Sequence, residues 1–480
     1  MTMRLSPLEG LDPAEAWAPW TPSPSDPWDR KWAGHLYRRA AFGVSWPELQ
    51  TAVESGPEVT IDRLLNGREG HDDFDQLMDE LGPDNSRFQV QNGSEAELQA
   101  WWLHRMVHTM HPLRERLVLF WHNHFATSIL KVRRSALMIQ QNVLIRRNAL
   151  GKFAPFLLEM SRDPAMLIWL DGNSNARGKP NENYAREVME LFTLGVGHYN
   201  ETDVREAARA FTGWHTDGRK FVFNRFQHDD GKKTLLGQTG DWDGPDVVRI
   251  VLEQPASARF LVRKLYRFLI SEGEPPSDAL LEPLAARYRA SGYDTAELVG
   301  TMLRSRLFFS EHAYRQRIKS PVEYVVGMLR SLEAKAETPS DFVLRRQQPR
   351  LMDGLGQALF APPNVKGWAG GEAWLNSATL LARHNLAWKI IQGTQGPLGI
   401  KTNPPALVRK YTSSSSRDAK GEVSFLLGLL LQPAEGEVDE RVNRKLVEFL
   451  AQDKPNAAPS ERRVRETIHA ILLMPEYQLS

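Results

Sequence analysis

Apolar residues recur every three or four positions along almost the whole chain after residue 30, a spacing that places them on one face of an α-helix. Each such segment must bury its apolar face against another element. The pattern therefore predicts a mainly α fold with a multi-helical, bundle-like architecture, in which at least half of the residues are helical. The clearest segments are residues 97–111, 113–122, 137–147, 182–194, 203–211, 246–254, 257–271, 280–291, 295–307, 321–333, 372–391 and 439–452.

One stretch, residues 213–240, interrupts the helical pattern. Phe221 and Phe223 alternate there with polar neighbours, and Asp229-Asp230-Gly231 supplies turn residues before another short apolar run. Alternation next to a glycine-containing turn is typical of a β-hairpin. We expect a small β-hairpin insertion over residues 213–245 and no other sheet of note.

Shifts in composition along the 480 residues indicate boundaries between parts of the chain. Prolines and tryptophans crowd residues 1–30, whereas Pro404-Pro405 and the serines at 413–416 are typical of a linker. The predicted parts are a Pro/Trp-rich N-terminal extension (1–30), a first helical part (31–212), the hairpin insertion (213–245), a second helical part (246–400), a linker (401–422) and a C-terminal helical segment (423–480).

The overall composition is that of an ordinary soluble globular protein, and it excludes several functions. The 60 Lys and Arg residues balance 59 Asp and Glu residues, so no nucleic acid is expected as a partner. Cysteine is absent, which leaves His, Asp, Glu and amide groups as the ligands for any metal ion. No apolar run approaches the roughly 18 residues of a transmembrane segment, and residues 1–30 show no secretory signal. The missing signal favours the cytoplasm, but it leaves the compartment open.

The segment from Asp171 to Glu182 lies between two helical segments and has some spacing of a calcium-binding loop. With Asp171 in the first position of an EF-hand, Asn173, Asn175 and Glu182 fall at later ligand positions. Ala176 replaces the glycine of the sharp turn, a proline interrupts the loop, and two basic residues offset its two carboxylates. A loop held by hydrogen bonds is therefore the favoured interpretation. The alternative is a divalent metal site with Asp171 and Glu182 as ligands.

The next segment, residues 183–194, carries two carboxylates on one helical face. At about 100° per residue, Glu187 and Glu190 share a face with Asn183 and Leu194, opposite an apolar face. Partly buried carboxylates need a cation, hydrogen bonds or a metal ion. Glu187 and Glu190 are candidate catalytic residues, and the alternative is that both pair with arginines.

Two histidines, His122 and His124, end an apolar helix that begins near Pro112. In a continuous helix their rings point about 160° apart, so they bind one metal ion together only if the helix breaks at Asn123. The favoured interpretation is therefore one core histidine and one exposed histidine. Because the helix is apolar, we expect at least one ring to lie buried near the 182–194 helix.

Polar residues at the expected hairpin turn form another candidate site. His228 and Asp229 are adjacent there and lie beside Lys232 and Lys233, an arrangement that suits acid–base catalysis. Turns are rich in Asp and Lys for structural reasons, so a structural role is the alternative.

The loop at residues 362–371, here called the tryptophan loop, carries Trp368 and opens a helix that bears Trp374. Trp368 and Trp374 can stack on a sugar or another flat apolar face, so both are candidate ligand-binding residues together with Asn364. The alternative is a packed structural loop. No Walker sequence, dinucleotide fingerprint or G-x-S-x-G elbow occurs, which argues against the common nucleotide-dependent and serine-hydrolase classes.

Five motifs run in order along most of the chain: residues 35–43 (HLYRRAAFG), 120–125 (FWHNHF), 178–187 (GKPNENYARE), 210–214 (AFTGW) and 362–368 (PPNVKGW). Together they resemble the bacterial family called domain of unknown function 1800. The resemblance implies no reaction, because that family has no settled activity. It implies relatives that often look exported and are encoded beside proteins resembling alkaline phosphatases and sulfatases. Many relatives also have His where this chain has Phe192.

Two functions are compatible with these features. The first is an enzyme, a metal-assisted hydrolase or related activity that acts on a polar or glycan-like substrate with a divalent metal ion. Its candidate residues are His122, His124, Glu187, Glu190, His228 and Asp229. The second is a non-catalytic binding or assembly protein that works with an alkaline-phosphatase- or sulfatase-like partner. Convergence of the candidate side chains in one cleft favours the enzyme, and their separation favours the binding protein.

Overall fold

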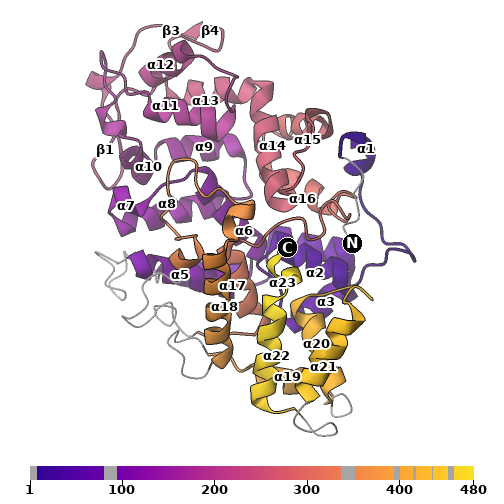
Figure 1. Ribbon diagram of the computed structural model, residues 1–480. Coiled ribbons are helices and arrows are strands. Elements are labelled where there is room, and N and C mark those ends of the chain that lie inside the picture. The colour runs from indigo at the N-terminus through magenta and orange to yellow at the C-terminus, as the bar shows by residue number, and fades with distance from the viewer. Residues whose placement is uncertain are drawn as a thin grey trace.

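The computed structural model describes residues 8–80, 95–336, 352–393, 401–413, 418–434, 436–451 and 459–480 (Figure 1). Helices make up 63% of the structure, which confirms the predicted mainly α fold. The strands of the described residues all lie between residues 214 and 240, in the region where the sequence predicts them.

The first half of the chain is helical up to the strands. Its helices are α1 (Pro13–Ala16), α2 (Arg30–Ala40), α3 (Trp46–Asn66), α4 (His71–Glu80), α5 (Glu95–His108), α6 (Pro112–His124), α7 (Ile129–Val132), α8 (Ser135–Asn148), α9 (Phe153–Ser161), α10 (Pro164–Trp169), α11 (Asn183–Glu187), the π-helix η4 (Val188–Thr193) and α12 (Glu201–Ala210). Short 3-10 turns lie at η1 (Leu8–Gly10) and η3 (Gly172–Ser174).

The second half is helical after the strands. Its helices are α13 (Gly244–Glu253), α14 (Pro255–Leu269), α15 (Asp278–Ala290), α16 (Thr295–Arg304), α17 (Pro321–Ser331), α18 (Ser377–Gln392), α19 (Pro404–Tyr411), α20 (Ala419–Leu430), α21 (Glu440–Ala451), α22 (Glu461–Leu473) and α23 (Pro475–Gln478). Its 3-10 turns are η5 (Arg225–Gln227), η7 (Asp353–Leu355) and η8 (Gly371–Trp374). The range 401–422, expected as a linker, contains α19 and the start of α20.

Many of these helices begin at side chains that cap the first free backbone amides. Asp163 accepts the backbone N–H of Met166 at the start of α10, and Ser320 and Glu323 form a capping box at the start of α17. A cap of this kind satisfies amides that the helix itself leaves unpaired. The helix boundaries are therefore written largely in local sequence.

The strands form two small antiparallel hairpins rather than the single hairpin expected from the sequence. Strand β1 (Trp214–Thr216) pairs with β2 (Phe221–Phe223), and β3 (Lys233–Leu235) pairs with β4 (Gln238–Gly240). The second hairpin turns at Leu236 and Gly237, which both have positive φ angles as tight hairpin turns require. Asp229-Asp230-Gly231 therefore lies between the two hairpins and not at a hairpin turn.

Helix α6 lies in the middle of the fold and contacts α2, α3, α5 and α8 (Figure 1). Every residue of α6 except Arg114 and Asn123 is buried. The hairpins lie at one end of the molecule and helices α19 to α22 at the other (Figure 1). The N-terminal extension packs on the helical core, because the Trp17 indole N–H donates to the Leu280 carbonyl at 2.6 Å. None of the helices in the described ranges is long and apolar enough to cross a lipid bilayer.

Candidate functional site

Three consecutive residues at the end of α6 contact two different elements. The His122 ring packs against the Trp368 ring, with 5.8 Å between centroids. The Asn123 Oδ1 accepts the backbone N–H of Trp368 at 2.7 Å, and its Nδ2 donates to the Trp368 carbonyl at 3.4 Å. The Lys264 Nζ lies 3.0 Å from the Nδ1 of His124. The end of α6 therefore holds the tryptophan loop on one side and α14 on the other.

A glycine allows the tryptophan loop to come this close to α6. Gly367 has a φ of +76°, and a Cβ at this position would lie 2.1 Å from the Asn123 Oδ1. A side chain is excluded both by that contact and by the left-handed backbone conformation. The motif at residues 362–368 thus needs Gly367 so that Asn123 can bind the backbone of Trp368.

The histidines at the end of α6 do not share a ligand position. Helix α6 is unbroken to His124, so the two rings face different neighbours, as helical geometry requires. The rings of His122 and His124 are 1% and 4% exposed, so the expectation of one exposed histidine is wrong. The reason is that Trp368 and Phe360 cover His122. His124 lies 5.8 Å from Phe192 between ring centroids, which confirms burial near the 182–194 helix.

A cavity of about 260 Å³ opens beside the end of α6. Its walls come from α6, α14, α17 and the tryptophan loop, which are far apart in sequence. This volume is slightly below the range of about 300–1,000 Å³ typical of sites for drug-sized ligands, so it suits a small molecule. The polar and aromatic side chains that line it include Asn123, His124, Lys264, Arg267, Glu272, Arg317, Glu323, Lys366, Trp368 and Trp374.

Basic side chains outnumber acidic ones around this cavity, by four to two. Both carboxylates are already paired. Glu323 accepts from Arg317 at 3.1 Å and forms an ion pair with Arg116, and Glu272 accepts from Arg317 at 3.0 Å. The Arg267 side chain has no ion pair or hydrogen bond within the described residues. The cavity is therefore cationic.

Two further arginines lie behind the cavity wall. Arg39 and Arg116 are fully buried, and the Nε of Arg116 donates to the Arg39 carbonyl at 3.1 Å. Burial, and then the nearby charge of Arg317, lower the pKa of both guanidinium groups. Arg39 comes from the motif at residues 35–43. This second row adds positive charge that the two carboxylates do not balance.

Lys264 has no carboxylate among its hydrogen-bonding partners in the described structure. Its Nζ lies 3.0 Å from the Leu191 carbonyl and 3.0 Å from His124 Nδ1. Burial lowers the pKa of Lys264 to about 7, and the charge of Arg267 contributes. The Leu191 carbonyl belongs to the π-helix η4, and π-helical turns often occur at functional sites because they leave backbone groups free of the regular helical ladder.

Glu187 and Glu190 are not among the residues that line the cavity. Burial, and then the charge of Glu190, raise the pKa of Glu187, and the charge of Lys366 opposes this shift. Glu190 accepts a hydrogen bond from the Tyr199 hydroxyl at 2.9 Å. The charge of Lys366, a lining residue, therefore acts on Glu187.

A family model described as "Protein of unknown function (DUF1800)" matches residues 35–479. The chain belongs to the DUF1800 family. No curated protein matches the chain, and no solved structure matches it either. Four of the five sequence motifs contribute to the cavity of the DUF1800 protein. Residues 120–125 and 362–368 line it, through the end of α6 and through Trp368. Residues 35–43 and 178–187 contribute Arg39 and Glu187, which interact electrostatically with the lining residues Arg317 and Lys366.

The carboxylates proposed as metal ligands in the DUF1800 protein each pair with a basic side chain. The Lys131 Nζ lies 2.9 Å from Asp171 Oδ2, and the Arg186 Nη2 lies 3.1 Å from Glu182 Oε2. Neither meets His122 or His124. Within the described part of the chain, no group of three or more His, Asp or Glu side chains is placed to hold a metal ion.

The amides of the same loop are engaged in hydrogen bonds. Asn173 exchanges two of them with the backbone of Thr216, at 2.9 and 2.8 Å. Asn175 donates to the Ala208 carbonyl at 3.0 Å and accepts the backbone N–H of Asn181 at 2.9 Å. The loop therefore ties β1 and α12 to η3, which is the arrangement favoured from the sequence, although its bonds reach across the fold rather than to the next residues.

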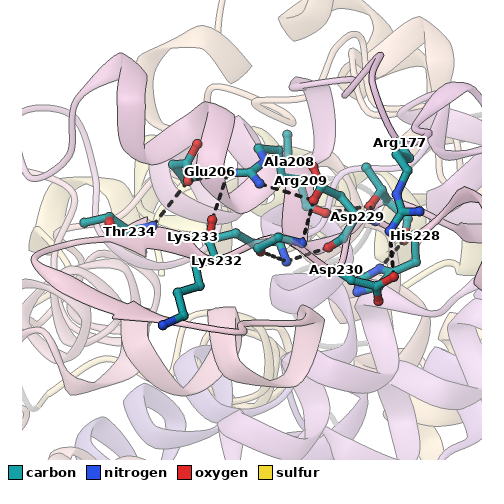
Figure 2. Close-up of polar contacts among 12 residues, drawn as sticks. Arg177, Glu206, Ala208, Arg209, His228, Asp229, Asp230, Lys232, Lys233 and Thr234 are labelled. Carbon is teal, nitrogen blue, oxygen red and sulfur yellow. Dashed lines mark hydrogen bonds and ion pairs between the residues drawn. The ribbon is translucent and has the colours of Figure 1, made fainter.

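The polar residues around His228 form a separate network, shown in Figure 2. Asp229 accepts two hydrogen bonds from Arg209, at 2.8 and 3.2 Å, and its carbonyl accepts one from Lys233 at 2.6 Å. The hydrogen bonds from Arg209 hold the pKa of Asp229 at about 2. His228 is buried and donates from Nδ1 to the Thr212 carbonyl at 2.8 Å. Within the described residues, no hydrogen bond or ion pair joins His228 or Asp229 to Glu187 or Glu190.

Of the three ligand-binding residues predicted in and after the tryptophan loop, two line the cavity. Trp368 and Trp374 line it and are 7% and 6% exposed. Asn364 instead shapes the loop, because its Oδ1 accepts the backbone N–H of Lys366 at 2.9 Å. Asn364 is therefore placed to hold the turn and not to line the cavity.

Several charged lining residues could not be singled out from the sequence alone. Lys264 and Arg267 lie three positions apart on α14, and Arg317 lies in the segment before α17. The only local signal is the capping pattern Ser320-x-x-Glu323, which predicts the helix start but not the buried ion pair. These residues meet only because α6, α14 and α17 pack together.

Proposed function

We propose that this DUF1800 protein binds a small organic anion with a flat apolar part in the cavity beside α6. The observation that carries the proposal is the excess of basic side chains in a small cavity walled by two tryptophans. A carboxylate, phosphate or sulfate group is the natural counterion, because guanidinium groups bind such groups through paired hydrogen bonds.

The tryptophans supply the second part of the recognition. Trp368 and Trp374 are almost completely buried yet line the cavity, so a flat ligand face can pack against an indole without further loss of water contact by the rings. A sugar that carries an acidic group has both features. The glycan-like ligand expected from the sequence is therefore compatible with this proposal.

The proposal favours ligand binding over metal-assisted hydrolysis as the starting point. The candidate residues for hydrolysis separate into the end of α6, the edge near Lys366 and the network around Asp229. Separation of this kind is what the binding hypothesis predicts. A phosphatase- or sulfatase-like partner remains compatible with such a role, because these enzymes act on anions.

Isothermal titration calorimetry with benzoate and with benzyl alcohol tests the proposal, since the two compounds share a ring and differ in charge. We expect benzoate to bind and inorganic phosphate to compete, with no binding of benzyl alcohol. Arg267→Gln should weaken benzoate about tenfold or more, because a hydrogen bond to a charged group contributes about 1.5–3 kcal/mol. Arg267 is exposed and lacks a partner in the described structure, so folding should be unaffected.

Arg259→Gln is the matched control, because Arg259 lies on the same helix α14 but faces the carboxylates of α15. It should bind benzoate as the wild type does. Equal affinities for the Arg267 and Arg259 variants, or equal binding of benzoate and benzyl alcohol, would show that the cavity does not recognise anions.

A further inference from the structure

The amine of Lys264 is bonded in a way that leaves an electron pair free. The Leu191 carbonyl accepts a hydrogen bond from this amine, and His124 Nδ1 accepts a second one when the ring carries its hydrogen on Nε2. A neutral amine has two N–H groups and one lone pair, so two acceptors take both hydrogens. The lone pair then occupies the remaining tetrahedral position of a nitrogen whose side chain lines the cavity.

The surroundings favour the neutral form of this amine. Burial is the main cause that lowers the pKa of Lys264 to about 7, and Arg267 adds repulsion between like charges. Burial and the charge of Lys264 also lower the pKa of His124, which keeps its ring neutral, and the tautomer with the hydrogen on Nε2 leaves Nδ1 as an acceptor. Desolvation and a neighbouring cation are the two features that activate lysine as a nucleophile toward carbonyl compounds.

Arg267 places an anion-binding group one helical turn from this amine. Positions three apart on a helix have Cβ atoms about 5–6 Å apart, so Lys264 and Arg267 begin from neighbouring points on the same wall. A small molecule with a carbonyl group next to a carboxylate can meet both side chains. Phe268 and Trp368 line the same cavity and limit the size of such a molecule.

We propose that Lys264 forms a covalent imine with the carbonyl carbon of a small oxo acid whose carboxylate is held by Arg267. This inference rests on the proposed function, since it uses the same cavity and the same anion. It names the ligand class as α-oxo acids and related acidic aldehydes, and it gives Lys264 a chemical role.

The step balances without any further reactant. The lone pair of the Lys264 Nζ attacks the carbonyl carbon, a C–N bond forms, and the C=O π electrons move to oxygen. One amine proton passes along the existing hydrogen bond to His124 Nδ1 and from there, through solvent, to the oxygen, which becomes a hydroxyl. Solvent supplies a second proton to this hydroxyl, which leaves as water when the nitrogen lone pair forms the C=N bond. The iminium nitrogen then releases its remaining amine proton to solvent, which restores the proton borrowed and leaves the imine.

Reductive trapping with sodium cyanoborohydride tests the inference on the wild-type protein. Glyoxylate is the probe, acetaldehyde lacks the carboxylate, and acetate lacks the carbonyl. Peptide mapping by mass spectrometry should find a carboxymethyl group on Lys264. An exposed lysine with a pKa of about 10.4 has roughly one neutral amine in a thousand at pH 7.4, so Lys264 should be labelled at least about tenfold faster than exposed lysines.

Two variants separate the amine from the cavity. Lys264→Met should abolish the trapped adduct at this position, whereas Lys410→Met, which removes an exposed lysine outside the cavity lining, should leave it intact. Arg267→Gln should slow trapping of glyoxylate about tenfold more than trapping of acetaldehyde, because acetaldehyde loses only the charge that helps to keep the Lys264 amine neutral. Should Lys264→Met fail to fold, the labelled position in the wild-type protein and the effect of Arg267→Gln still decide the question.

The outcomes distinguish this inference from the proposed function. Benzoate binding without an adduct on Lys264 would overturn the imine while the anion site stands. Absence of both would remove the proposed function as well. An adduct on Lys264 that forms equally with acetaldehyde, or that Arg267→Gln does not slow, would refute the role of Arg267 in holding an oxo acid.

Discussion

Glu323 has two roles: it caps α17, and its charge neutralises two buried arginines. Replacing it by glutamine tests how much the buried charge stabilises the cavity wall. The carboxylate accepts from Arg317, forms an ion pair with Arg116 and accepts the backbone N–H of Ser320. Glu323 is 4% exposed. Glu323→Gln keeps the shape and one acceptor oxygen but removes the charge.

The expected loss of stability follows from these contacts. Removing one partner of a buried ion pair costs about 3–5 kcal/mol, because the remaining charge stays buried without compensation. Glutamine can still accept the capping N–H, and a retained cap is worth about 1 kcal/mol. The net loss in the free energy of unfolding should be about 3 kcal/mol.

Urea unfolding followed by circular dichroism measures this loss. With a slope of about 3 kcal/mol per molar urea, the midpoint should fall by about 1 M. Glu311→Gln is the control, since the Glu311 side chain is 61% exposed in its ion pair with Lys31 and such pairs contribute about 0–1 kcal/mol. Phosphate should restore part of the loss in Glu323→Gln by pairing with the freed arginines. Equal midpoints for the two variants would refute the assignment of a buried charge pair.

Three further results are expected. Gly367→Ala should weaken benzoate binding by about tenfold, because the new Cβ forces Asn123 to release the Trp368 loop and each lost hydrogen bond costs about 1 kcal/mol; unchanged calorimetry would contradict this. Burial raises the pKa of Asp163 from 3.8 to about 7, so the folded state binds the proton more tightly and stability falls as the pH rises from about 4 to about 7. Asp163→Asn should remove that fall, and parallel urea midpoints across this window would reject it. Asp229→Asn should speed hydrogen exchange of the backbone at residues 228–235, because it weakens the bonds from Arg209, without changing benzoate affinity.

The helical fold could be predicted because its information is local. Amphipathic spacing gives each helix its buried face, and caps such as Asp163 and Ser320 mark where helices begin. The second hairpin was not separable from the first, because its turn depends on the backbone conformation of Leu236, a residue that rarely has a positive φ angle.

The aromatic part of the candidate site could also be predicted, whereas its charged part could not. His122, His124 and Trp368 stand in short motifs of unusual residues. In the sequence, Lys264 resembles any basic residue of an amphipathic helix. Its neighbour in the cavity, His124, lies 140 positions away in the chain. Long-range packing decides that contact, and no periodicity in the sequence encodes it.

The loops expected as catalytic or metal sites show why residue type alone misleads. Asn173 and Asn175 have the oxygen atoms that a calcium site needs, but the same amides are the usual means of tying a loop to neighbouring backbone. Asp229 likewise serves Arg209. Turn chemistry and ligand chemistry use the same side chains, so only the partners distinguish them.

The excess of basic side chains around the cavity lowers the stability of the folded state. Replacing buried ion pairs by apolar residues of similar size is often neutral or stabilising, so folding alone does not require Arg39, Arg116 and Arg317 to surround only two carboxylates. Their repulsion is relieved when an anion enters. A ligand that binds only the folded state stabilises it by an amount that grows with its concentration, so the natural anion should raise the unfolding midpoint of the wild type more than that of Arg267→Gln. Under the proposed function the excess charge has a physical reason, because a bound anion would neutralise part of it.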